Sequence, residues 1–83
     1  MEISEIQDAA LETKFVIRSY SKSELAQLYA PDITSKAAVK KLNHWIALKP
    51  GLLDKLYVTG MAPKAKYYTP LQVHIIVEAL GEP

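Results

Sequence analysis

Two helical patterns interrupted by a proline are the strongest constraint on how this chain can fold. Ser21 is followed by Glu24 at the spacing of a capping box, which marks the start of a helix. Pro31 ends that first pattern, because the residue before a proline disfavours helical backbone. A longer pattern follows after a short connector. The stretch therefore predicts a helix over about 22–30, a turn, and a second helix over about 35–48.

The second of these helices, capped by Thr34 or Ser35, has two unlike faces. Successive residues turn by about 100° along a helix, so side chains three or four positions apart share a face. The apolar face predicts the contact with the core and consists of Ala38, Val39, Leu42, Trp45, Ile46 and, in line with them, Lys49. The opposite face must meet solvent or a partner and consists of Lys36, Lys40, Asn43, His44 and Ala47.

Proline and glycine positions predict two further helices. Pro50 suits the first turn of a helix over about 50–57. The segment 59–65 contains a glycine and a proline and is typical of a loop. Pro70 follows a threonine, which is a favoured start for a last helix over 70–80.

Two short runs rich in β-forming residues lie at 15–18 and 66–68, and they can pair as a ribbon. Residues 14–83 therefore predict one mainly α domain. We expect a small helix–turn–helix-like bundle of about four helices, with the two-stranded, wing-like ribbon as a compatible addition. Residues 1–13 are expected to be either a short acidic helix or a tail, since an isolated helix of this length is marginal in water.

The composition excludes several classes of protein. Eighty-three residues form one domain at most, and 49% hydrophobic residues are too many for a disordered chain. The absence of cysteine excludes disulfides and thiolate metal sites. The acidic start is unlike a secretory signal, and the longest apolar run is broken by charge, so we expect a cytoplasmic protein without a membrane partner.

Charge is unevenly distributed although the net charge is only +1. Residues 1–13 carry four acids and no base, whereas residues 14–66 carry all ten lysine and arginine residues against three acids. Residues 67–83 carry two more acids. The middle of the chain is thus a basic body, to which a polyanion or the acidic start of the chain itself can be attracted.

DNA is the partner that the outer face of the second helix favours. A recognition helix presents polar and basic side chains to the major groove, with its N-terminal half nearest the bases. Lys36 and Lys40 can reach phosphates or guanine acceptors, Asn43 can pair with adenine, and His44 lies beside them. The alternative is a solvated lysine face, which many surface helices have. The helix contains no arginine, although arginine is the commonest reader of guanine.

A second set of basic residues is expected to contact the DNA backbone. Lys64 and Lys66 lie on the wing-like segment, and Arg18 and Lys22 lie on and beside its predicted partner strand. The alternative is an ordinary basic loop beside tyrosines that pack on the core.

No pattern predicts catalysis or a metal site. The two histidines are His44 and His74, and the spacing of His74 and Glu78 predicts a surface ion pair on one helix turn. Metal-ligand spacings and a glycine-rich phosphate loop are absent from the sequence. We therefore expect no catalytic residues, no metal, no cofactor and no small-molecule substrate.

The last helix has apolar residues on two sides. One stripe predicts its core contact, whereas Leu71 and Ile75 lie nearer the opposite side. Such a helix is either sandwiched or part of an interface. A homodimer is compatible with DNA binding, because helix–turn–helix proteins commonly bind DNA as dimers.

The chain resembles a family of small Bacteroidetes proteins known as domain of unknown function 4248, over about residues 14–83. The positions that carry the resemblance are Arg18-Ser19-Tyr20, Glu24-Leu25-Ala26, Tyr29, Pro31, Ala37-Ala38, Leu42, Trp45-Ile46, Thr69-Pro70 and Leu80-Gly81-Glu82-Pro83. The resemblance implies a one-domain protein and carries over no catalytic residue. More loosely, the chain is similar to excisionase-like and MerR-like helix–turn–helix domains, which pair this motif with a small wing.

Two functions follow as predictions. The first is a DNA-binding helix–turn–helix module of a transcriptional regulator or of a mobile-element accessory protein. The alternative is a non-catalytic module for protein interaction or dimerisation, with Leu71 and Ile75 as its anchors.

Overall fold

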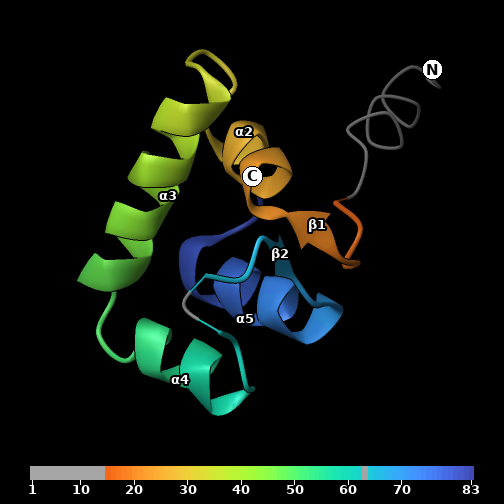
Figure 1. Cartoon of the computed structure of the whole chain (residues 1–83), viewed down its shortest axis with the longest axis vertical. Helices are drawn as coiled ribbons and strands as arrows, with labels where there is room; N and C mark the ends of the chain where they lie inside the picture. Colours follow the sequence, from red (N-terminus) through yellow and green to blue (C-terminus); the bar gives the residue numbers. More distant parts are fainter. Residues whose placement is uncertain (1–14, 63) are drawn as a thin grey trace, which may run out of the picture.

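The chain forms four helices and a two-stranded antiparallel sheet, which confirms the predicted mainly α fold (Figure 1). The computed structural model describes residues 15–62 and 64–83, so the prediction for residues 1–13 lies outside the described residues. In chain order the elements are β1 (Tyr20–Ser21), α2 (Lys22–Tyr29), α3 (Ser35–Leu48), α4 (Leu52–Val58), β2 (Tyr67–Tyr68) and α5 (Pro70–Leu80).

Side-chain caps start both helices of the central pair. The Ser21 hydroxyl accepts a hydrogen bond of 3.0 Å from the Glu24 N–H, and the Thr34 hydroxyl accepts one of 3.2 Å from the Ala37 N–H. The Glu24 carboxylate pairs mainly with Arg18, so the well-formed half of the predicted capping box is the hydrogen bond to the Ser21 hydroxyl. Helix α2 ends one residue before Ala30, the last residue of its predicted range.

Helices α2 and α3 pack most extensively against each other, and the remaining elements close the core around them. The buried apolar residues are Tyr20, Leu25, Ala26, Ala38, Leu42, Ile46, Leu52, Leu56, Tyr68, Val73 and Ile76. On α3 the buried line runs through Ala38, Leu42 and Ile46, which are each four residues apart. Trp45 is therefore only half-buried, and the sequence-based placement of Lys49 on the apolar face was wrong, because Lys49 is exposed at the end of the helix.

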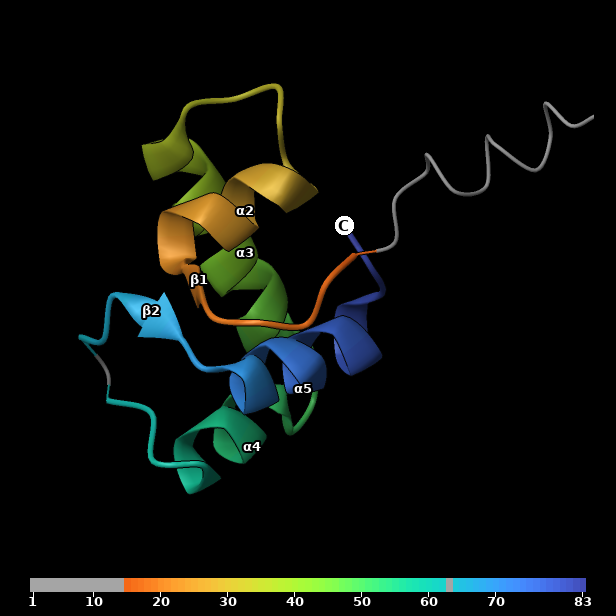
Figure 2. The same ribbon diagram turned by 90° about the vertical axis from the view of Figure 1, so that its right-hand side faces the viewer.

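The second strand of the ribbon lies within its predicted range, whereas the first strand begins beyond the predicted run 15–18. Tyr20 and Ser21 pair with Tyr68 and Tyr67, whereas residues 15–18 form no strand. The Phe15 ring stacks on Tyr20 at a centroid distance of 5.3 Å, and the Tyr20 hydroxyl donates a 2.8 Å hydrogen bond to the Val16 carbonyl. The run of β-forming residues thus packs against Tyr20 and takes no part in the β-ladder. The ribbon lies between α2 and α5 (Figure 2).

Gly51 moves the start of α4 to Leu52, two residues beyond Pro50. Its φ of 78° lies in the left-handed region, which glycine adopts without a steric penalty. Pro50 consequently sits in the turn before the helix rather than in its first turn.

Helix α5 has a complete capping box and fills its predicted range. The Thr69 hydroxyl accepts a hydrogen bond from the Gln72 backbone N–H, and the side-chain Oε1 of Gln72 accepts one of 2.9 Å from the Thr69 backbone N–H. The side-chain amide of Gln72 also donates a hydrogen bond of 2.8 Å to the Thr59 hydroxyl. That hydroxyl in turn donates one of 2.6 Å to the Leu56 carbonyl. This buried chain of hydrogen bonds joins the start of α5 to the end of α4. Across the residues that the structure describes, no helix has the length and apolar character needed to cross a membrane.

Candidate functional site

The outer face of α3 is the surface that the sequence predicted, and its predicted residues are exposed. Lys36, Lys40, Asn43 and His44 all lie on the side of the helix away from the core. The helix forms one edge of the molecule in Figure 1, and it extends for about 20 Å at 1.5 Å per residue. It contains three lysines and no acid, and all three lysines lie in its first half, so the positive charge is concentrated near the start of the helix.

The structure brings Asn43 together with Lys22, which is distant in the sequence. Both line a small hollow of about 180 Å³, with Tyr57, Met61 and Tyr68 among its other walls. The Lys22 ammonium lies 5.3 Å from the centroid of the Tyr68 ring, and burial lowers the pKa of Lys22. The start of α2 thus places a cation beside the outer face of α3.

The ribbon adds Lys66 to this pair. The Lys22 N–H donates a 2.9 Å hydrogen bond to the Lys66 carbonyl, and both side chains line a second hollow of about 390 Å³ with Ser21 and Ser23. Lys64 is exposed in the loop that leads into β2. Asn43, Lys22 and Lys66 therefore follow one another across the surface, from α3 over the start of α2 to the ribbon.

Arg18 has a different environment from the lysines. Its guanidinium lies 3.8 Å from the centroid of the Tyr20 ring. It donates a hydrogen bond of 2.9 Å to the Glu24 carboxylate and one of 2.6 Å to the Ser19 carbonyl. The hydrogen bond to Glu24 raises the pKa of Arg18, and the same bond lowers the pKa of Glu24. The Arg18 charge is thus compensated by an acid of the same chain, so a phosphate would have to compete with Glu24 for it.

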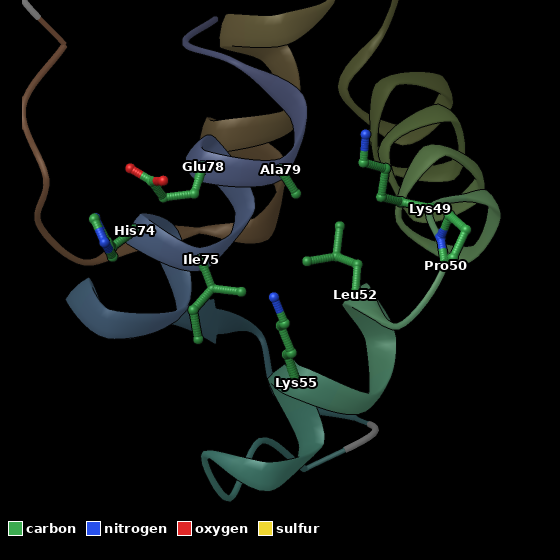
Figure 3. A pocket seen from close by; sticks show the side chains of 8 residues that line it. All are labelled: Lys49, Pro50, Leu52, Lys55, His74, Ile75, Glu78 and Ala79. Atoms are coloured by element: carbon green, nitrogen blue, oxygen red, sulfur yellow. The ribbon is translucent and has the colours of Figure 1, made fainter.

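The two predicted interface residues of α5 differ in exposure. Leu71 exposes 56% of its surface, whereas Ile75 is half-buried. Ile75 lines a hollow of about 410 Å³ between α4 and α5, together with Leu52 and His74 (Figure 3). Leu71 alone therefore offers a free apolar side chain at this face.

His74 lines this hollow together with Glu78, the residue with which an ion pair was predicted. Over residues 15–62 and 64–83, the ion pair that forms is Arg18–Glu24, so the predicted His74–Glu78 pair was wrong. Figure 3 shows the Lys55 ammonium pointing into the gap between α4 and α5. Among the described residues that line the hollow, none carries a hydroxyl or a thiol that His74 could activate. The prediction that the protein is not an enzyme stays a prediction.

Lys41 is a feature of α3 that the sequence reading left out. It lies at the edge of the outer face, and its ammonium is 5.7 Å from the centroid of the Trp45 ring. The spacing of the two residues, four apart on a helix, was the available signal. In the part of the chain that the structure describes, no group of three His, Asp or Glu side chains is placed to hold a metal ion.

Comparison with known proteins assigns a family but no activity. A family model described as "Domain of unknown function (DUF4248)" matches residues 16–83, which is most of the chain. No curated protein matches the chain, and no solved structure matches it.

Proposed function

We propose that this chain, which belongs to the family described as "Domain of unknown function (DUF4248)", is a non-catalytic DNA-binding module in which α3 enters the major groove. The observation that carries the proposal is the exposed, acid-free outer face of α3, continued by Lys22 and Lys66. Exposed lysines attract DNA, because lysines that meet phosphates release condensed counterions.

Each polar side chain has a role that its position supports. Lys36 and Lys40 lie in the first half of α3, which approaches the bases most closely in a helix–turn–helix complex. Asn43, on the same line of the helix, has the donor and acceptor that adenine requires. Lys22, Lys64 and Lys66 flank the helix and would contact phosphates, which position the protein without reading sequence.

The proposal extends to the structural kinship of the domain and to its biological setting. The order of α2, a tight connector, α3 and a nearby ribbon supports kinship with excisionase-like and MerR-like domains. A source among the Bacteroidetes, a cytoplasmic location and a role in transcription or in a mobile element are consistent with that kinship and are proposed with it.

The test compares two double substitutions that change the net charge equally. Lys36→Glu with Lys40→Glu reverses charge on the outer face of α3, whereas Lys49→Glu with Lys55→Glu reverses it beside the hollow between α4 and α5. Fluorescence anisotropy with a labelled duplex at low salt should show a loss of about tenfold or more for the first pair and a much smaller loss for the second. Equal losses would mean that only net charge matters, and an unchanged affinity for the first pair would overturn the proposal.

A second candidate function is self-association through α5, which the 56% exposure of Leu71 favours. Analytical ultracentrifugation of the wild type should then show a dimer that Leu71→Lys dissociates. Val58→Lys is the matched control, because Val58 is 86% exposed on a different helix. A monomer at all concentrations for every variant would exclude this candidate.

A further inference from the structure

We infer that the hollow between α2, α3 and the chain end after α5 binds a cationic group, either an alkylammonium or a guanidinium, of a partner molecule. The hollow has a volume of about 330 Å³ and is lined by Tyr29, Trp45, Leu80, Glu82 and Pro83. It shares no lining residue with the surface proposed for DNA, so the inference does not depend on the proposed function.

Two aromatic rings form a corner in this hollow. Tyr29 and Trp45 meet edge to face, with ring centroids 6.3 Å apart and planes inclined by 73°. Both side chains are half-buried, so parts of their rings remain accessible from outside. Aromatic faces carry a negative quadrupole potential and attract ammonium and guanidinium groups, and aromatic cages bind quaternary ammonium ligands.

A carboxylate lies among the residues that line the hollow beside the two rings. The Tyr29 hydroxyl donates a hydrogen bond to the Gly81 carbonyl, which ties the segment after α5 to α2 (Figure 2). Glu82 follows directly and lines the hollow. Burial, with a smaller contribution from the Glu82 charge, raises the pKa of Tyr29 to about 12.

The chain already places a cation on one of these rings. The Lys41 ammonium lies 5.7 Å from the centroid of Trp45, within the range of a cation–π contact. The hollow itself is lined by an acid and by no base, whereas the hollows that contain Lys22, Lys66 or Lys55 would repel a cation. Aromatic walls and the Glu82 carboxylate therefore favour a positive ligand in this hollow.

Trp45 makes the inference directly measurable, because it is the only tryptophan of the chain. The full-length protein would be titrated at constant ionic strength with tetramethylammonium chloride, with N-acetyl-arginine amide and with N-acetyl-lysine amide, against sodium chloride. We expect a saturable change of Trp45 fluorescence with the organic cations but not with sodium. The strongest response identifies the source, a free quaternary ammonium or a basic side chain of a partner protein.

Variants assign the response to the site. Glu82→Gln should weaken binding by about threefold or more, since it removes a negative charge that attracts a cation to the aromatic rings. Glu78→Gln is the matched control, because Glu78 lines the other side of α5 and should leave the titration unchanged. Lys41→Met should strengthen binding, because it removes the internal cation that competes for Trp45.

Two results would overturn the inference: a response no larger than that to sodium chloride, or equal binding by the wild type and Glu82→Gln. Far-ultraviolet circular dichroism checks that each variant is folded. The pair Lys36→Glu with Lys40→Glu should bind the cations as the wild type does, so failure of the DNA proposal and failure of this inference are distinguishable.

Discussion

At the scale of single residues, Gln72 is the polar side chain that the core requires. It is 4% exposed, and both ends of its amide are used: the oxygen accepts from Thr69, and the nitrogen donates to Thr59. A buried amide is tolerated only when its hydrogen bonds are made, because an unpaired buried donor keeps its full desolvation penalty. The Gln72 side chain thus makes the junction of α4 and α5 depend on one hydroxyl group.

Removing that hydroxyl should destabilise the fold. Thr59→Val keeps the shape of the side chain but leaves the Gln72 donor unpaired, so we expect a loss of about 1–3 kcal/mol in the free energy of unfolding. Thr59→Ser keeps the hydroxyl and should lose less. Urea unfolding followed by Trp45 fluorescence measures both, and the hydrogen bond would be unimportant if the valine and serine variants were equally stable.

Two tyrosines give the fold a dependence on alkaline pH. Burial, with the Glu82 charge in the case of Tyr29, raises the pKa of Tyr29 and of Tyr68 to about 12, above the ordinary value of 10.0. The unfolded chain therefore releases these protons first, and the stability present below pH 10 should fall as the pH rises toward 12. Chemical denaturation across this range should show the fall, and Tyr68→Phe should flatten it. A pH-independent stability would contradict the two shifts.

At the scale of elements, the central pair α2–α3 depends on its connector. The Thr34 hydroxyl caps α3, and the Gln27 amide donates a 2.7 Å hydrogen bond to the Ile33 carbonyl. Thr34→Ala should cost about 1 kcal/mol of stability, because an N-terminal N–H of α3 loses its acceptor. Thr34→Ser keeps the cap and serves as the control in thermal unfolding. Equal melting temperatures for all three proteins would show that the cap contributes nothing.

Elements with local signals could be predicted from the sequence, and elements fixed by distant contacts could not. The caps at Ser21, Thr34 and Thr69 placed three helix starts correctly, since each cap acts on the turn that follows it. The strand prediction for 15–18 was wrong because the first strand forms at Tyr20–Ser21, where its distant partner Tyr67–Tyr68 lies.

The candidate site likewise has features that the sequence predicts and features that depend on packing. Helical periodicity was enough to show that Lys36 and Lys40 face outward on α3. The meeting of Asn43 with Lys22, or of Trp45 with Glu82, depends on how separate elements pack. No local pattern in the sequence contains that information.

At the scale of the whole molecule, the basic residues should make DNA affinity depend strongly on salt. If Lys22, Lys36, Lys40, Lys64 and Lys66 each neutralise one phosphate, the logarithm of the binding constant should fall against the logarithm of salt concentration with a slope of about −4 to −5. Lys22→Gln with Lys66→Gln should reduce the magnitude of that slope by about two. Anisotropy titrations at several salt concentrations measure it, and an unchanged slope in the double variant would remove these two lysines from the interface.

The ribbon also determines when this surface exists. Its two strands lie at Tyr20–Ser21 and Tyr67–Tyr68, and the helices α2, α3 and α4 lie between them along the chain. Closing so long a loop is entropically costly until the intervening helices have collapsed together. Until the two strands pair, nothing holds Lys22 and Lys66 beside each other, because more than 40 residues separate them along the chain. The surface that carries both lysines therefore forms only when the whole domain folds.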